Sequence, residues 1–247
     1  MIEFNKEDIY IVTGASSGIG KAVALLLNKL GATVVGIGRN IERLQELQKE
    51  ATTPSTMFIE QKELTEDIDG LPAYIKSLKE KYGKFKGLVC CAGINLDAPL
   101  RMLSLENALK QINTNYLVPI FMAKGIADKR NHVAEGTSIV FIASISAFVG
   151  EKSQTIYGAT KAGLIASVKT LARELAPTVR INTISPGATD TPMLQSSIQM
   201  LGKNDVLNNT PLSLGKPSDI ASLVAFLVSD KANWITGQNY IIDGGVA

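Results

Sequence analysis

The feature that most constrains the fold is a regular alternation of short apolar runs with longer amphipathic segments. Seven runs rich in β-branched residues recur along the 247-residue chain. They are residues 9–14, 33–38, 56–61, 87–93, 138–144, 180–187 and 239–245. Strands that alternate with helices form right-handed βαβ units, and evenly apolar strands are covered on both faces. The sequence therefore predicts an α/β protein with a doubly wound, seven-stranded parallel sheet flanked by helices.

The same alternation runs from one end of the chain to the other, which bounds its class and its partners. Residues 1–247 contain no repeat, low-complexity stretch or linker, so we expect a single domain. A net charge of +2 without a Lys/Arg block predicts no nucleic-acid partner. The N-terminal stretch is acidic, and we find no window of about 18 apolar residues that could span a membrane. A cytoplasmic protein is expected.

Cysteine and histidine, which commonly bind transition metals, are scarce in this chain. Cys90 and Cys91 are the only cysteines, and as neighbours they offer neither a disulfide framework nor a metal-ligand spacing. His132 is the only histidine and lies in the polar stretch DKRNHVAEG, so we expect it to be a solvated loop residue. The sequence predicts no metal site and no histidine-based catalysis.

The first apolar run leads into a glycine-rich loop, TGASSGIG, at residues 13–20. Gly14 permits a tight turn, Gly18 lets the backbone approach a phosphate, and Gly20 allows the helix to pack closely on the strand. The free N–H groups at the start of the following helix favour a pyrophosphate. This loop lies between a strand and a helix, which is the context of a nucleotide site, and the alternative is a purely structural turn.

The end of the second predicted strand bears on the choice of cofactor. An acid that binds the ribose hydroxyls of NAD would stand near Gly38, and none is present there. Arg39 follows, and an arginine suits the 2′-phosphate of NADP. The sequence therefore favours NADP(H), with NAD(H) as the alternative if Arg39 is only a surface charge that begins the next helix.

Tyr157 and Lys161 stand four residues apart, within TIYGATKAG. On a helix these two side chains share a face. A lysine cation beside a phenol favours the phenolate and lowers the pKa of the phenol, which makes it a workable general acid or base. The alternative is a solvated helix face that carries both residues by chance.

Several motifs together resemble the short branch of the short-chain dehydrogenase/reductase family, over nearly the whole chain. The glycine loop matches its T-G-x-x-x-G-x-G pattern, and Tyr157 and Lys161 match its Y-x-x-x-K pair. Ser144 stands thirteen residues before the tyrosine, where the family has its catalytic serine, and Asn115 matches its helix asparagine. The C-terminal WITGQNYIIDGG also resembles the family's ending.

The resemblance implies a single Rossmann domain and a reaction that moves a hydride between a nicotinamide and a carbonyl or alcohol. Tyr157 would exchange a proton with the substrate oxygen, and Ser144 would hold that oxygen. Lys161 would lower the pKa of Tyr157 and bond the nicotinamide ribose, and Asn115 would support Lys161 through water. Small residues between Tyr157 and Lys161 would let their helix lie close to the cofactor.

The resemblance also implies a cofactor site drawn from many parts of the chain. Its residues are Gly14, Ser16, Ser17, Gly18, Ile19, Gly20, Arg39, Glu63, Leu64, Cys91, Ala92, Gly93, Tyr157, Lys161, Pro186, Gly187, Thr189 and Thr191. Two positions depart from the family pattern. Cys90-Cys91 replaces the usual Asn-Asn, with Cys91 expected to be a structural thiol, and Glu63 replaces an aspartate or asparagine.

Substrate recognition is expected in residues 94–100, 145–154 and 188–212, the last of which should form a lid. In the last two stretches, the candidates for an apolar pocket are Phe148, Met193, Leu194, Met200 and Leu201, with ordinary packing as the alternative. Lys152 and Lys203 are candidates for binding an anionic substrate, and the alternative, solvated lysines, is the commoner case. The resemblance suggests a 3-oxoacyl thioester of acyl carrier protein. A sugar, steroid or small ketone is the alternative within the same chemistry, and a nucleotide-binding sensor or scaffold of low activity is the alternative outside it.

The helical segments near 103–128 and 155–176 carry apolar residues on more than one face. A helix that is apolar beyond one stripe is buried further than a surface helix. The resemblance implies that these helices pair between subunits, so a homotetramer, or at least a homodimer, is expected.

Overall fold

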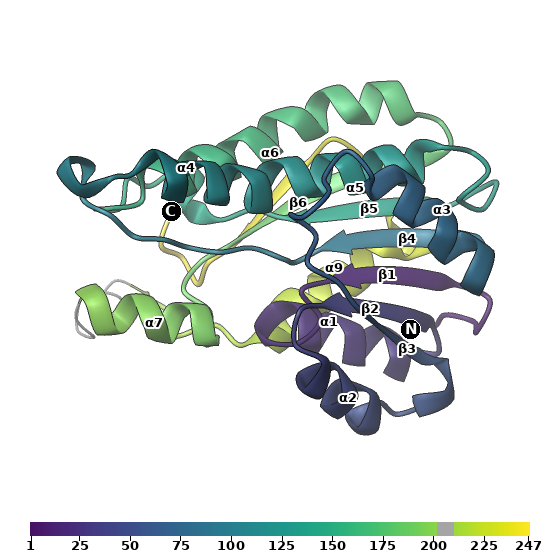
Figure 1. The fold of residues 1–247 in the computed structure, drawn as a ribbon. Coiled ribbons are helices and arrows are strands. Elements are labelled where there is room, and N and C mark those ends of the chain that lie inside the picture. Colours follow the sequence, from purple (N-terminus) through teal and green to yellow (C-terminus); the bar gives the residue numbers. More distant parts are fainter. Residues whose placement is uncertain (202–209) are drawn as a thin grey trace.

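The computed structural model describes residues 1–201 and 210–247, and these fold around one parallel sheet. The sheet has seven strands in the order β3-β2-β1-β4-β5-β6-β7 (Figure 1). The strands are β1 (Ile9–Thr13), β2 (Thr33–Gly38), β3 (Met57–Gln61), β4 (Phe85–Cys90), β5 (Thr137–Ile142), β6 (Val179–Pro186) and β7 (Asn239–Ile242). The predicted doubly wound, seven-stranded parallel sheet is confirmed.

Helices cover both faces of the sheet (Figure 1). One face carries α1 (Gly18–Lys29), α2 (Ile41–Glu50) and α9 (Pro217–Val228). The other carries α3 (Leu71–Tyr82), α5 (Val118–Ala127) and α6 (Thr155–Leu175). The strands are therefore buried on both sides, which is why their sequences are evenly apolar rather than alternating.

The pleat of each strand divides its side chains between two cores. In β1, Tyr10 and Val12 enter the core beneath α1 and α9, whereas Ile9 and Ile11 enter the core beneath α3 and α5. This is the period of two expected of a strand. Each central strand contributes side chains to both cores, so the sheet is packed between its two helical layers.

The helical segment predicted near 103–128 is interrupted by a π-turn. It consists of α4 (Leu105–Ile112), the π-turn η3 (Asn113–Leu117) and α5. A π-turn inserts one extra residue into a helix and often occurs at functional sites. Asn115, a predicted site residue, lies within this turn and is fully buried.

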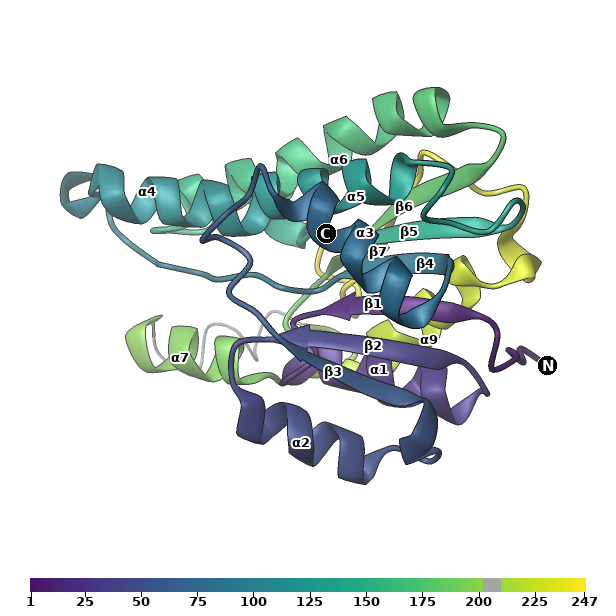
Figure 2. The ribbon, with the colours of Figure 1, turned by 45° about the vertical axis from the view of Figure 1, so that its right-hand side comes forward.

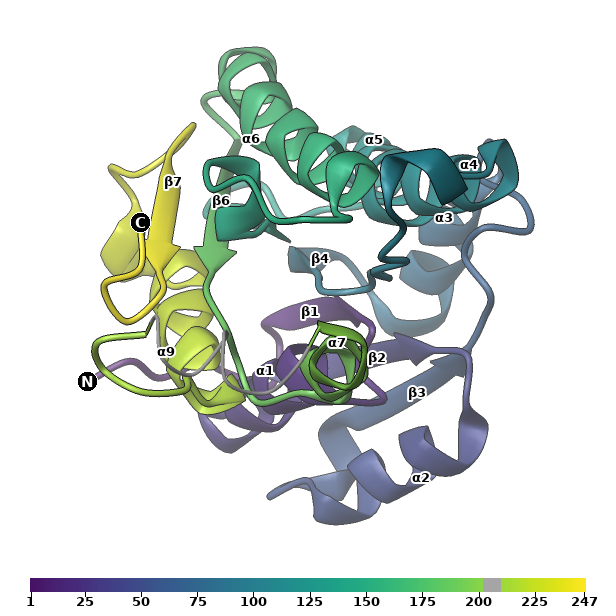
Figure 3. The same ribbon diagram turned by 90° about the vertical axis from the view of Figure 1, so that its left-hand side faces the viewer.

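The order of the strands reverses between β1 and β4, and the loops that follow these two strands diverge. Ligands of doubly wound sheets bind in the crevice at such a point, beyond the carboxyl ends of the strands. Figure 3 views the molecule from this side, with α7 (Pro192–Leu201) in front of the sheet. The N-terminus lies at the opposite end (Figure 2).

Two expectations need correction or restriction. His132 is only 2% exposed and accepts or donates a hydrogen bond with Thr137 Oγ1, so it is a buried residue and not a solvated one. Of the predicted lid, 188–212, residues 202–209 lie outside the described residues, as do Lys203 and the side chains of Met200 and Leu201. Within the described chain, no helix is long and apolar enough to cross a membrane.

Candidate functional site

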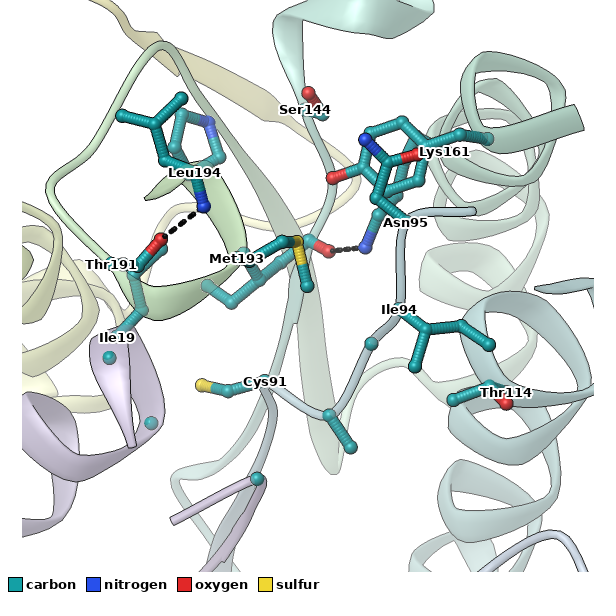
Figure 4. Close-up of a pocket in the computed structure, with 18 of the residues that line it drawn as sticks. Ile19, Cys91, Ile94, Asn95, Thr114, Ser144, Lys161, Thr191, Met193 and Leu194 are labelled. Atoms are coloured by element: carbon teal, nitrogen blue, oxygen red, sulfur yellow. Dashed lines mark hydrogen bonds between the residues drawn. The ribbon is translucent and has the colours of Figure 1, made fainter. Parts of the chain in front are cut away.

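A cavity of about 790 Å³ lies beyond the carboxyl ends of the strands. Every catalytic and cofactor-binding residue predicted from the sequence lines it except Asn115, which is buried. The lining comes from the glycine loop, the ends of β2 to β6, the start of α6 and the start of α7. Figure 4 shows the part of it around Cys91, Ser144 and Lys161. The fold therefore gathers residues from positions 14 to 246 into one site.

The glycine loop is shaped by backbone contacts that leave no room for side chains. Gly14 has a φ of +67°, and a Cβ there would lie 2.8 Å from the backbone nitrogen of Ala92. A Cβ on Gly20 would lie 2.3 Å from the carbonyl oxygen of Gly14. Ser17 precedes the first turn of α1, and its side chain makes no capping bond to that turn. The first N–H groups of α1 are thus left for a ligand, and the cradle fits the pyrophosphate of a dinucleotide.

Arg39 and Glu63 face each other at one end of the cavity. Arg39 Nη1 lies 3.4 Å from Glu63 Oε2. Glu63 also accepts hydrogen bonds from the backbone and hydroxyl of Thr65. Burial acts to raise the pKa of Glu63, but the bonds from Thr65 and the charge of Arg39 outweigh it and lower this pKa. Arg39 therefore stands beside an ionised carboxylate.

The loop after β4, which begins at Cys91, is tied to the end of β1 by a hydrogen bond. Thr13 Oγ1 accepts a hydrogen bond of 3.2 Å from the backbone nitrogen of Ala92. Cys91 lines the cavity, and burial raises the pKa of its thiol to about 12, against the opposing charge of Lys161. A thiol with this pKa is protonated at neutral pH, which fits the expected structural role rather than a reactive one.

The side chain of Asn115 forms two hydrogen bonds with the backbone of Ile94, which lies in the same loop after β4. Its Oδ1 accepts from Ile94 N and its Nδ2 donates to Ile94 O, both at 2.8 Å. Nδ2 also lies 3.4 Å from Thr160 Oγ1 on α6. The amide thus joins the π-turn to the loop after β4 and to α6. Its hydrogen bonds go to the backbone of Ile94 and to Thr160, which adds a role in loop placement to the predicted support of Lys161.

Ser144 begins a chain of hydroxyl and amide bonds at the wall of the cavity. Its Oγ accepts from Ser146 N and donates to Ser146 Oγ, each at 3.1 Å. Ser146 Oγ in turn donates to Gln154 Oε1 at 2.9 Å. A Cβ on Gly158 would lie 2.6 Å from Ser146 O. Because Gly158 has no side chain, α6 can pack closely against the turn that carries Ser144 and Ser146. The sequence had predicted only a close approach of this helix to the cofactor.

Tyr157 lies beside Ser144, half-buried at the wall of the cavity. Burial raises its pKa to about 12; the hydrogen bond with Ser144 lowers this pKa, and the charge of Asp97 raises it further. The expectation that Lys161 lowers the pKa of Tyr157 is not met in this structure. Lys161 Nζ lies 5.6 Å from the centre of the phenol ring and donates to Ile142 O instead. Burial is therefore the dominant influence on Tyr157.

Lys161 is itself buried, on the same face of α6 as Tyr157. Its Nζ donates a bond of 2.8 Å to Ile142 O, the last residue of β5 (Figure 4). Burial lowers its pKa to about 8, although the neighbouring Cys91 and Cys90 act to raise it. An ammonium group has three N–H donors, so the bond to Ile142 leaves two for a ligand. Lys161 is placed to hold hydroxyl groups within the cavity.

Some substrate-side predictions match the cavity and others do not. Met193, Leu194 and Lys152 line it, whereas Phe148 is 53% exposed and does not. Sequence reasoning assigned no individual role to Asn95 or Ser197, which also line the cavity. Asn95 was within reach of such reasoning, because it follows β4 at the edge where the carboxyl ends of the strands meet. Ser197 carried no signal, because a serine on a helix is unremarkable by spacing alone.

No cluster of three or more His, Cys, Asp or Glu side chains that could hold a metal occurs among residues 1–201 and 210–247. What the cavity brings together is a phosphate cradle, an arginine–glutamate pair, and a half-buried phenol with a serine hydroxyl and a lysine amine. This arrangement suits binding of a dinucleotide and proton transfer to an oxygen beside it.

Comparison with known proteins agrees with this chemistry. Residues 14–247 match a family model described as enoyl-(acyl carrier protein) reductase. The chain is 36% identical to the 3-oxoacyl-(acyl-carrier-protein) reductase FabG of Thermotoga maritima over 241 residues, which covers 96% of this chain and 97% of that protein.

Two solved structures have the same fold. A short-chain dehydrogenase/reductase from Brucella melitensis, described as a glucose/ribitol dehydrogenase, superposes with a TM-score of 0.92 and 31% identity, covering 100% of this chain and 99% of the other. A variant of actinorhodin polyketide ketoreductase with NADPH superposes with a TM-score of 0.90 and 26% identity, covering 99% and 98%. The similarity extends over the whole length of each protein.

Lys161 should give the stability of the protein a pH dependence of definite sign. Its pKa is about 8 in the fold and 10.5 as a free side chain. The unfolded chain therefore binds more protons between these pH values, and the free energy of unfolding rises with pH across this window. In Lys161→Met this contribution is absent. We expect the parent to gain up to about 1.4 kcal/mol per pH unit relative to the variant.

Urea unfolding at the two ends of this window measures the difference. The control is Lys169→Met, which removes an exposed lysine from the same helix and should follow the parent. A parent and a Lys161→Met variant whose unfolding free energies run in parallel would contradict the buried, titrating lysine.

Proposed function

Because the chain belongs to the short-chain dehydrogenase/reductase family, and is therefore a nicotinamide-dependent oxidoreductase of carbonyl and alcohol groups, we propose that it reduces a 3-oxoacyl thioester with NADPH. The observation that carries the proposal is the placement of Tyr157, Ser144 and Lys161 in the cavity that also contains the glycine cradle. The similarity to the Thermotoga maritima 3-oxoacyl reductase over 96% of the chain supports the substrate class.

In this proposal each polar residue at the site has one task. When the substrate binds, the Ser144 hydroxyl redirects its one hydrogen from Ser146 Oγ to the substrate carbonyl oxygen, which places that oxygen beside Tyr157. A phenol with a pKa of about 12 is fully protonated at neutral pH, so Tyr157 has a proton to give to the more basic oxygen of the forming alcohol. Lys161 holds ribose hydroxyls with its remaining N–H groups. Asn115 positions the loop after β4 through Ile94.

The residues of the cradle hold the dinucleotide. The N–H groups at the start of α1 bind the pyrophosphate, and Ala92, Gly93, Pro186, Gly187, Thr189 and Thr191 enclose the remainder. When bound, the nicotinamide supplies the hydride, while the protein supplies placement and the proton. The described part of the predicted lid, including α7, borders the substrate end of this space.

We assign the preference for NADPH to Arg39. Its guanidinium is 67% exposed at the cavity wall, so a phosphate can reach it. An arginine binds phosphate bidentately and keeps its charge at working pH. The carboxylate of Glu63, 3.4 Å away, opposes a second anion at the same place. The net preference is therefore modest rather than absolute.

We also propose that the chain forms a homotetramer. Leu105 and Leu109 project from α4 and are 75% and 47% exposed, and Leu100 and Met102 nearby are exposed as well. Four exposed apolar side chains so close together in the sequence are typical of an interface. Closed symmetry would bury them by pairing identical faces.

Tyr157→Phe tests the catalytic assignment. Only the proton donor is lost, so we expect turnover of an acetoacetyl thioester to fall by about a hundredfold to ten-thousandfold, with unchanged affinity for NADPH. Tyr74→Phe is the matched control, since it removes the hydroxyl of a tyrosine on α3 that does not line the cavity, and it should keep full activity. Retained turnover in Tyr157→Phe would refute the mechanism.

The cofactor assignment is tested by titrating NADPH and NADH into the protein at low salt. A charge-assisted hydrogen bond contributes about 1.5–3 kcal/mol, which corresponds to roughly tenfold or more in affinity. Because Glu63 opposes the phosphate, we expect about a tenfold preference for NADPH in the parent, and a ratio near one in Arg39→Ala. Arg43→Ala, on the exposed face of α2, should behave as the parent. Equal affinities in the parent would show that Arg39 is only a surface charge.

Assembly is tested by light scattering at micromolar concentration. We expect a mass of four chains of 26.4 kDa each, and a smaller species in a double variant, Leu105→Glu with Leu109→Glu, that places charge on the exposed face of α4. A parent protein that scatters as a single chain would contradict the proposed assembly.

A further inference from the structure

Three polar side chains form a hydrogen-bonded cluster at the substrate end of the cavity. Asn95 and Asp97 come from the loop after β4, and Ser197 comes from α7. Asn95 Nδ2 donates to Ser197 Oγ at 3.4 Å, and Ser197 Oγ donates to Asp97 Oδ2 at 3.1 Å. Figure 4 shows Asn95 extending from this loop toward the end of the cavity where Ser144 and Lys161 lie.

The cluster leaves two oxygen atoms unused. Asn95 Oδ1 and Asp97 Oδ1 are buried and have no hydrogen-bond partner in the described part of the chain. Buried polar atoms of native proteins are nearly always paired, and an unpaired one calls for an explanation. Because the amide N–H of Asn95 is directed to Ser197, both free atoms are acceptors. What they lack is a donor.

One of the two unpaired acceptors belongs to Asn95, which lines the cavity, and Asp97 is joined to Asn95 through Ser197. Asn95 and Ser197 line the same cavity as Tyr157 and Ser144. The charge of Asp97 acts on Tyr157 and raises its pKa, so the two groups are within electrostatic reach of each other. A substrate whose carbonyl oxygen meets Ser144 and Tyr157 would therefore bring a neighbouring group to the cluster.

We propose that Asn95, Asp97 and Ser197 form a substrate subsite that selects a neutral hydrogen-bond donor, a hydroxyl or an amide N–H, near the reacting carbonyl. The negative charge of Asp97 makes the same subsite unfavourable for a carboxylate. This inference rests on the proposed carbonyl reduction and narrows its substrate class. The donor has two sources: the hydroxyl of a hydroxylated ketone, or the amide of the arm that carries an acyl thioester.

Two pairs of probes, each differing by one donor, distinguish these sources. Hydroxyacetone and butanone have the same shape, and only the first has a hydroxyl. Acetoacetyl-N-acetylcysteamine has one amide N–H, and its N-methyl analogue has none. We expect kcat/KM for the donor-bearing member of at least one pair to be greater by about tenfold or more, the effect of one hydrogen bond to a charged group.

The variants are Asn95→Leu and Asp97→Asn. In both, the ratio of kcat/KM between the two members of a pair should fall toward one. Glu106→Gln is the control: it makes the same change of charge on α4 outside the cavity and should keep the preference of the parent. Urea unfolding establishes that each variant is folded. A preference in the first pair identifies a hydroxylated substrate, and one in the second pair identifies the thioester arm.

A binding readout separates this inference from the proposed function. Saturation-transfer NMR compares 1,2-propanediol with 2-butanol, the product alcohols, on the protein saturated with NADP⁺. One outcome is that no probe is reduced, while 1,2-propanediol binds better than 2-butanol to the parent but not to Asn95→Leu. In that case the reductase assignment is wrong and the subsite stands. Reduction of all four probes without a preference, or with one that both variants keep, overturns the subsite and leaves a cluster that only ties α7 to the loop.

Discussion

The amide of Asn115 is the interaction on which the catalytic end of the molecule depends. The amide forms hydrogen bonds with both the N–H and the C=O of Ile94, each at 2.8 Å, as a neighbouring strand would do. Ile94 lies where the chain, having left β4, turns across the cavity. Gly93, just before it, lies against Lys161, and Asn95, just after it, reaches Ser197. Without this amide the N–H and C=O of Ile94 would lose these hydrogen-bond partners, and the loop would be held less firmly.

The two halves of the cavity are built by different means. The dinucleotide half is made of backbone, where the absence of a Cβ at Gly14 and Gly20 sets the spacing. The catalytic half is made of buried and half-buried side chains, and burial disfavours whichever form of a group is charged. It therefore raises the pKa of Tyr157 and lowers that of Lys161, so the two groups are shifted in opposite directions. A neutral phenol and a weakly held ammonium proton result from the same cause.

The sequence was sufficient for features that depend on local pattern. The strands and their parallel arrangement were predicted from the apolar runs and their alternation with helical segments. The glycine loop was predicted from the spacing of its glycines. Strand ends were less exact: the fourth run was expected to continue to residue 93, but β4 ends at Cys90, where Ala92 turns to bond Thr13. Periodicity does not reveal such side-chain contacts between distant segments.

Features that depend on the surroundings of a group were beyond the sequence. His132 lies in a polar stretch, yet the fold buries it against Thr137. The sequence predicted that Lys161 would lower the pKa of Tyr157, because the two are four residues apart, but the amine turns to Ile142 O. Arg39 was recognisable as a phosphate ligand, whereas its pairing with Glu63 requires that the ends of β2 and β3 be known to lie side by side.

The π-turn at Asn113–Leu117 has a consequence for how this protein can change in evolution. The wider i→i+5 turn accommodates one extra residue, so α4 and α5 continue along one helix while the backbone inside the turn is widened. Deleting one residue between 113 and 117 would leave a regular helix and remove this widened turn, from which Asn115 reaches the backbone of Ile94. In this segment, a deletion is therefore more disruptive than most substitutions.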